Sequence, residues 1–257
     1  MIDCTRKGFV LNTRIDTRRV RHTGLVLGLF AAALWAGAAN AYDAGPVANG
    51  GSISGTVKYK GTPPARAKLD VNKDTDVCGA GGEKLAKDLV VASDGGIQYA
   101  VVTIPGIAKG KPFADAKPVL DQKGCEYAPH IVLMKAGGDL DIQNSDGILH
   151  NIHTYSEKNP PLNRAQPKFK KTMTESFKEP EKVRLACDVH GWMQGWLIVE
   201  NNPYVAITDE KGAFKLTDVP PGDYEVTVWQ EKLGESTQKV SVKPGADTPV
   251  NFELAGK

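Results

Sequence analysis

The chain has 257 residues, 41% of them hydrophobic, and carries 32 Lys or Arg against 30 Asp or Glu. Such a chain can bury one large core or two small ones, and no low-complexity tract indicates wholesale disorder. The balanced charge excludes the strongly basic surface that binds nucleic acid. The sequence also lacks a phosphate-binding loop, a dinucleotide fingerprint and a nucleophile elbow, which argues against the enzyme classes that these motifs mark.

Residues 1–41 are typical of a secretory signal peptide. An apolar run from Gly24 to Ala38 follows the basic residues Arg14, Arg18, Arg19 and Arg21, and a small-x-small cleavage site ends at Ala41. A membrane anchor is the alternative, but the run has only 15 residues and a spanning helix needs about 20. Cleavage before Tyr42 removes six basic and two acidic residues, which leaves 26 basic and 28 acidic ones. We expect a periplasmic or secreted protein with no membrane span after cleavage.

Three cysteines remain after the predicted cleavage, and their odd number suggests one bridge and one thiol with another role. Cys78 and Cys125 lie beside glycines in turn-like surroundings, so they are the better disulfide pair. Cys187 is the cysteine left over.

Alternation of apolar and polar residues dominates the mature chain, which predicts an all-β fold built from two sandwiches. The alternating segments are residues 53–59, 67–71, 97–101, 140–142, 183–187 and 224–228. Proline and glycine turns separate them. Residues 159–171, rich in proline and lysine, are predicted to form a long surface loop whose charges are solvated.

The C-terminal segment, residues 201–257, contains TDEKGAFKLTDVPPGDYEVTV from Thr208 to Val228. This text resembles the carboxypeptidase-regulatory or transthyretin-like domain, a motif specific for a fold but nearly silent about function. Only five strands can be counted there, where the resemblance implies about seven, and five strands would leave an exposed edge. GSISGTVKYKGTPPARAKLDV at residues 51–71 resembles the opening of the same domain. We therefore hypothesise that residues 42–83 complete this sandwich and that residues 84–200 are inserted into it.

The strongest chemical signal is RLACDVHGWM at residues 184–193, which places Cys187, His190 and Met193 on one loop at the end of a predicted strand. A fourth ligand must come from another strand, and His150 in HNIH is the candidate. Thiolate and thioether sulfurs suit Cu(I), and imidazoles remain good ligands for Cu(II), so one scaffold can hold both oxidation states. The ligand set therefore predicts one mononuclear copper ion.

Residues 127–200 resemble the cupredoxins, and among them the amicyanins, in the Cys-x2-His-x2-Met loop, in HNIH and in the closing strand WLIVE. The resemblance implies a Greek-key β-sandwich at residues 84–200, with His150, Cys187 and His190 as equatorial ligands and Met193 as the axial one. Asn151 would tie the two ligand loops together. The implied activity is one-electron transfer to or from a redox protein partner, without catalysis. Leu185, Ala186 and Trp192 depart from the family's pattern, as does the additional domain.

Several alternatives remain open at this point. Cys187 could be a buried structural thiol and Met193 a plain core residue. Strand alternation places His153 on the face opposite His150, and His130 is interpreted as structural. Zinc could be bound by one cysteine and two histidines, although methionine is a poor zinc ligand. The alternative function is a non-redox adhesive or scaffold protein whose site is structural, with zinc, or empty.

Overall fold

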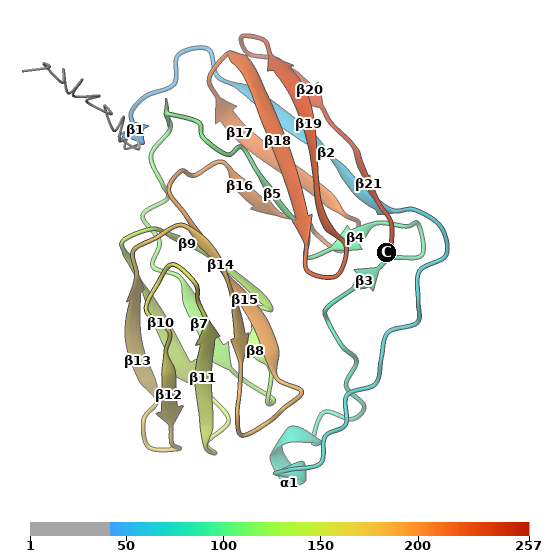
Figure 1. Ribbon diagram of the computed structural model, residues 1–257, viewed down its shortest axis with the longest axis vertical. Coiled ribbons are helices and arrows are strands. Elements are labelled where there is room, and N and C mark those ends of the chain that lie inside the picture. Colours follow the sequence, from blue (N-terminus) through green and yellow to red (C-terminus); the bar gives the residue numbers. More distant parts are fainter. Residues whose placement is uncertain (1–41, 257) are drawn as a thin grey trace, which may run out of the picture. The chain divides into compact units, whose positions relative to one another are not determined.

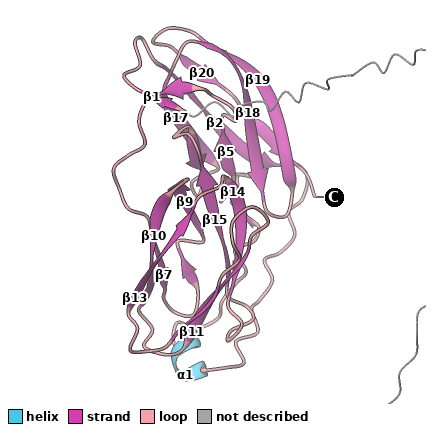
Figure 2. Ribbon diagram, turned by 60° about the vertical axis from the view of Figure 1, so that its left-hand side comes forward, coloured by secondary structure: helices cyan, strands magenta, loops and turns pink. Residues whose placement is uncertain are grey.

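The computed structural model describes residues 42–256. The predicted signal peptide, residues 1–41, lies outside the described residues. Strands form nearly all the regular structure, and α1 (Thr75–Cys78) is the single helix in the described part (Figure 2). Within residues 42–256, no helix has the length and apolar character needed to cross a bilayer. The all-β fold class predicted from the sequence is confirmed.

Residues 119–200 form two sheets that share one core, here called the first sandwich. One sheet has the order β13-β10-β7-β8 and the other the order β12-β11-β14-β15-β9. Alternation directs every second side chain inward, so Leu140 and Ile142 meet Val183 and Leu185, all fully buried. The strands are β7 (Val119–Gln122), β8 (Tyr127–Ala128), β9 (Ile131–Lys135), β10 (Gly138–Asn144), β11 (His150–Tyr155), β12 (Asn163–Gln166), β13 (Thr172–Phe177), β14 (Glu181–Ala186) and β15 (Gln194–Glu200).

The second sandwich combines the C-terminal strands with two strands from earlier in the chain. Its sheets have the orders β16-β5-β18-β19 and β17-β2-β20, and β21 also pairs with β2. Figure 1 shows β2, drawn in blue, among the red and orange C-terminal strands. The strands are β2 (Gly51–Tyr59), β5 (Val101–Thr103), β16 (Val205–Ile207), β17 (Ala213–Val219), β18 (Gly222–Gln230), β19 (Gly234–Val242), β20 (Asp247–Pro249) and β21 (Phe252–Leu254).

Strand pairing places β5 in the second sandwich, although Val101–Thr103 falls within the range 84–200 expected for the first. Val102 is fully buried in the same core as Ile53 and Val228. Two small pairs complete the described strands: β1 (Asp43–Ala44) with β6 (Lys109–Gly110), and β3 (Val90–Val91) with β4 (Ile97–Gln98).

Three local expectations are corrected by the structure. The alternating residues 67–71 form no strand and make only an isolated bridge from Lys68 to Leu85, because this segment is largely exposed. Tyr99 has a φ of 65°, which interrupts the alternating run at residues 97–101. Residues 159–171 are not loop throughout, since β12 pairs with β11 and buries Gln166.

Candidate metal centre

The four predicted ligands come from two places at one end of the first sandwich. His150 opens β11, whereas Cys187, His190 and Met193 lie on the connection between β14 and β15. Ala186 pairs with Gln194, so this antiparallel pair closes the connection into a short loop. Within the loop the amide of Cys187 donates to the carbonyl of Met193 at 3.2 Å, and the amide of Met193 donates to the carbonyl of His190 at 2.9 Å.

Three potential ligand atoms converge inside this loop. The Nδ1 atoms of His150 and His190 are 3.0 Å apart, and Sγ of Cys187 lies 3.8 Å from Nδ1 of His190. Three ligands bound at the lengths typical of Zn²⁺, about 2.0 Å to nitrogen and 2.3 Å to sulfur, would be separated by roughly 3.5 Å (N to N) and 3.7 Å (N to S). The observed N–S spacing matches this value, whereas the two nitrogens lie closer together than a bound metal ion would hold them, at the distance of a hydrogen bond.

All four side chains are shielded from solvent: His150 and His190 are 0% exposed, Met193 is 1% exposed and Cys187 is 3% exposed. Met193 packs in the same apolar core as Cys187. The structure thus brings the two imidazoles and the thiol into one group and places Met193 in the apolar cluster that contains Cys187.

Carboxylates bind the outer nitrogens of both imidazoles. Nε2 of His150 lies 2.8 Å from Oδ2 of Asp146, and Nε2 of His190 lies 2.8 Å from Oδ2 of Asp74. If each Nε2 donates its proton to a carboxylate, each neutral ring presents a lone pair at Nδ1. Two lone pairs facing each other at 3.0 Å repel unless a proton or a metal ion lies between them. The donor set therefore fits a bound cation.

Without a metal ion, a proton can lie between the two Nδ1 atoms, because the surroundings of His150 favour its protonated ring. Burial alone would lower the pKa of His150, but hydrogen bonds with Asp146 and Cys187 outweigh it and raise the pKa to about 9. Burial alone would raise the pKa of the Cys187 thiol, whereas hydrogen bonds from His150 and from backbone amides give a net lowering. The site thus favours the thiolate, which is the form of cysteine that binds metals.

Asn151 connects the two ligand-bearing segments. Its Oδ1 accepts a hydrogen bond of 2.5 Å from the backbone amide of Asp188, and its Nδ2 donates to Oδ1 of Asn163 at 2.7 Å. Asn151, which follows His150, is thereby held to Asp188, which follows Cys187. This geometry is the one expected if Asn151 ties the loops together.

Tyr127 makes a similar connection that sequence reasoning missed. Its buried hydroxyl lies 2.8 Å from the carbonyl of Asn151 and 2.8 Å from the carbonyl of Ala186. One phenol therefore spans the strands that carry His150 and Cys187. The sequence holds no local signal for this contact.

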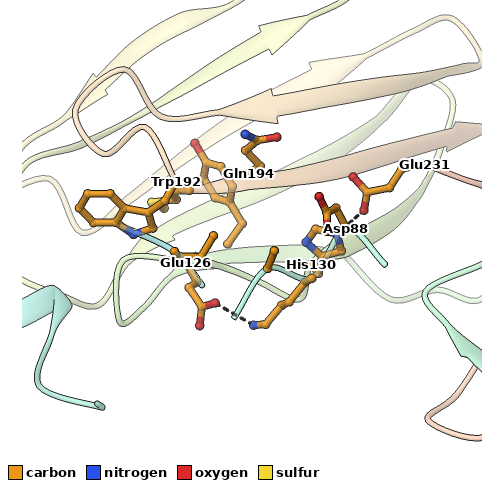
Figure 3. A pocket seen from close by; sticks show the side chains of 11 residues that line it. Asp88, Glu126, His130, Trp192, Gln194 and Glu231 are labelled. Carbon is orange, nitrogen blue, oxygen red and sulfur yellow. Dashed lines mark hydrogen bonds and ion pairs between the residues drawn. The ribbon is translucent and has the colours of Figure 1, made fainter. Parts of the chain in front are cut away.

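Within residues 42–256, the two other histidines lie outside the group. His153 pairs with Asp188 at 2.9 Å near the surface. Nε2 of His130 is 2.6 Å from Oε1 of Glu231, whose Oε2 accepts a hydrogen bond from Nε1 of Trp196 at 2.7 Å. Figure 3 shows His130 and Glu231 on one side of a small pocket and Trp192 on the other.

A disulfide joins Cys78 to Cys125 beside the centre, and Cys187 is the free cysteine of the described residues. The sulfur atoms of the disulfide and a ring nitrogen of His190 lie within 4.8 Å of one another. Asp146 accepts hydrogen bonds from the amides of Gly124, at 2.5 Å, and Cys125, at 2.7 Å. The disulfide loop is thus connected to His150 through Asp146.

Family models and curated proteins were both compared with the chain. Residues 198–255 match the model of the carboxypeptidase regulatory-like domain, in agreement with the resemblance of residues 208–228. No curated protein matches the chain.

Solved structures with local similarity include two kinds of copper protein. A Cu-containing nitrite reductase from Thermus scotoductus is 16% identical with a TM-score of 0.31, and the match covers 35% of this chain and 24% of that one. A Cu(I) form of an amicyanin variant is 22% identical with a TM-score of 0.31, and the match covers 38% of this chain and 98% of that one. A reduced form of another amicyanin variant is 24% identical with a TM-score of 0.30 and the same coverage.

Proposed function

We propose that this chain is an exported protein that binds one copper ion and transfers single electrons. The observation that carries the proposal is the convergence of the Nδ1 atoms of His150 and His190 with Sγ of Cys187 in a buried group. Met193 would be the weak fourth ligand. A bound copper ion would supply a one-electron Cu(I)/Cu(II) couple.

The chain's own residues would keep the ligands in place in both oxidation states. Asn151 and Tyr127 hold the two ligand segments together, and the loop hydrogen bonds fix Cys187 relative to Met193. Because little would have to move when the charge of the site changes, the cost of reorganisation would be small. Small reorganisation favours fast electron transfer.

Burial favours electron transfer over catalysis. The ligand side chains are at most 3% exposed, so a substrate could not reach them without rearrangement, whereas an electron needs no opening. We therefore propose no enzymatic activity and expect a redox protein as the partner. The predicted signal peptide and the disulfide between Cys78 and Cys125 suit a periplasmic or secreted site of action.

Optical spectroscopy of the copper-loaded protein tests the proposal. Cys187→Ala should abolish the intense visible band, because thiolate-to-copper charge transfer produces it. Met193→Leu should keep the band and raise the reduction potential by about 60 mV or more, which is at least tenfold in relative affinity for Cu(I). The reason is that an apolar side chain replaces a weak donor to Cu(II).

His153→Ala is the matched control, since His153 lies on β11 with His150 but bonds to Asp188 instead of pointing into the group. Its spectrum should equal that of the wild type. An unchanged band in Cys187→Ala would refute the copper assignment. Uptake of Zn²⁺ without any colour from copper would instead favour the scaffold alternative.

A further inference from the structure

Asp74 has an unusual relation to the helix that it begins. It is the N-cap residue of α1, a position where an aspartate side chain ordinarily accepts a hydrogen bond from the first turn. Here the side chain makes no cap hydrogen bond, and the backbone has the left-handed φ of 47°. Its Oδ2 instead lies 2.8 Å from Nε2 of His190, which is 116 residues away in sequence. The carboxylate is therefore directed away from its own helix.

The disulfide fixes this helix over His190. Cys78 is fully buried at the end of α1, and its amide donates to the carbonyl of Asp74 at 2.8 Å. Cys125, its partner, accepts a hydrogen bond from Nε1 of Trp192 at 3.2 Å through its carbonyl, and the Trp192 ring lies 5.2 Å from the His190 ring. Residues 74–78 and Trp192 thus cover His190, which is 0% exposed, while the Asp74 side chain remains 40% exposed.

We infer that Asp74 is a positioning residue of the metal site, held in place by the bond between Cys78 and Cys125. By accepting the Nε2 proton, Asp74 leaves the lone pair of His190 at Nδ1, the atom that faces His150 and Cys187. This inference rests on the proposed function, because Asp74 would fix the tautomer of His190, one of the proposed ligands of that metal site. The role belongs to a segment outside the residues that supply the ligands.

Metal-free protein gives the first test, by ¹⁵N NMR of the His190 ring. The wild type should show the tautomer with hydrogen on Nε2. Asp74→Ala should populate both tautomers, whereas Asp74→Asn should retain the wild-type tautomer, since its amide oxygen can still accept the hydrogen bond. Asp76→Ala is the matched control on the same helix, because Asp76 is exposed and is not among the hydrogen-bond or ion-pair partners of His190.

Competition titration with Cu²⁺ gives the second test. Asp74→Ala should weaken binding about 10- to 100-fold, Asp74→Asn by less, and Asp76→Ala by less than twofold. Equal tautomers and equal affinities in Asp74→Ala and Asp76→Ala would overturn the inference. If the wild type takes up no Cu²⁺, the proposed function fails, and the tautomer comparison in metal-free protein still decides the role of Asp74.

Discussion

Protonation of Glu200 should make the free energy of unfolding depend on pH. It ends β15 with a half-buried side chain, and burial raises the pKa of its carboxyl to about 7, although Lys182 and Lys158 act in the opposite direction. In the unfolded chain its pKa is about 4.3. The folded state therefore binds the proton more tightly, so this stabilisation is complete below about pH 4.3 and is lost as the pH rises through 7.

Glu200→Gln should remove this dependence. Between pH 5 and pH 8 the free energy of unfolding of the wild type should fall relative to the variant by on the order of 3 kcal/mol. Urea unfolding followed by circular dichroism at both pH values measures the difference. Glu225→Gln, at an exposed position on β18, is the control and should follow the wild type. Parallel pH profiles for Glu200→Gln and the wild type would show that the buried carboxyl does not titrate as expected.

Among single residues, those of the Cys187 loop could be predicted because their spacing is local. The three residues occupy seven positions at a strand end, so any closed loop there brings them together. Asp146 precedes His150 by four residues, and the sequence shows the proximity but not the role. Asp74 has no such signal, because its contact with His190 exists only once the disulfide and the fold are formed.

Among the elements, the bond between α1 and the loop that carries Cys125 should contribute strongly to stability. It closes a separation of 47 residues, for which the chain-entropy relation gives about 4 kcal/mol. The double variant Cys78→Ser/Cys125→Ser should lower the free energy of unfolding by that order. Urea unfolding of metal-free protein at fixed pH measures it, and reduction of the wild type should reproduce the loss.

Peptide mass mapping without reductant is the accompanying check. The wild type should yield the Cys78–Cys125 peptide pair and an unpaired Cys187. A bridge to Cys187 would remove the proposed copper thiolate and contradict both the stability prediction and the function.

Strand periodicity predicted β2, β10, β14 and β18 but failed where the local backbone conformation or exposure prevented a regular strand. Tyr99, with a φ of 65°, separates β4 from β5. Apolar alternation gives no sign of a residue with this backbone conformation. Residues 67–71 have the alternating pattern without a neighbouring strand to pair with. Gln166 is polar, yet it is fully buried because it bonds with Gln122, so β12 gave no apolar signal.

For the whole molecule, the second sandwich depends on strands far apart in sequence. The family match covers residues 198–255, which contain β16 to β21 but neither β2 nor β5. Residues 51–71 resemble the opening of the same domain, which made the participation of residues 51–59 predictable. The participation of β5 was not predictable, because a buried strand of three residues is too short to show an alternation of apolar and polar residues. The domain boundaries themselves stay predictions.

This topology makes a prediction about fragments. β2 lies between β17 and β20, and β5 lies between β16 and β18, so a fragment of residues 201–257 would lose an inner strand of each sheet. It would also lose the fully buried side chains of Ile53, Val57 and Val102, each contributing about 1.5–3 kcal/mol. That loss is comparable to the entire stability of a typical domain, about 5–15 kcal/mol.

The fragment should therefore give no cooperative urea transition and poorly dispersed amide resonances, whereas residues 42–257 should unfold cooperatively. A cooperative transition in the fragment would mean that β16 to β21 form a sufficient core and that β2 and β5 merely attach to it.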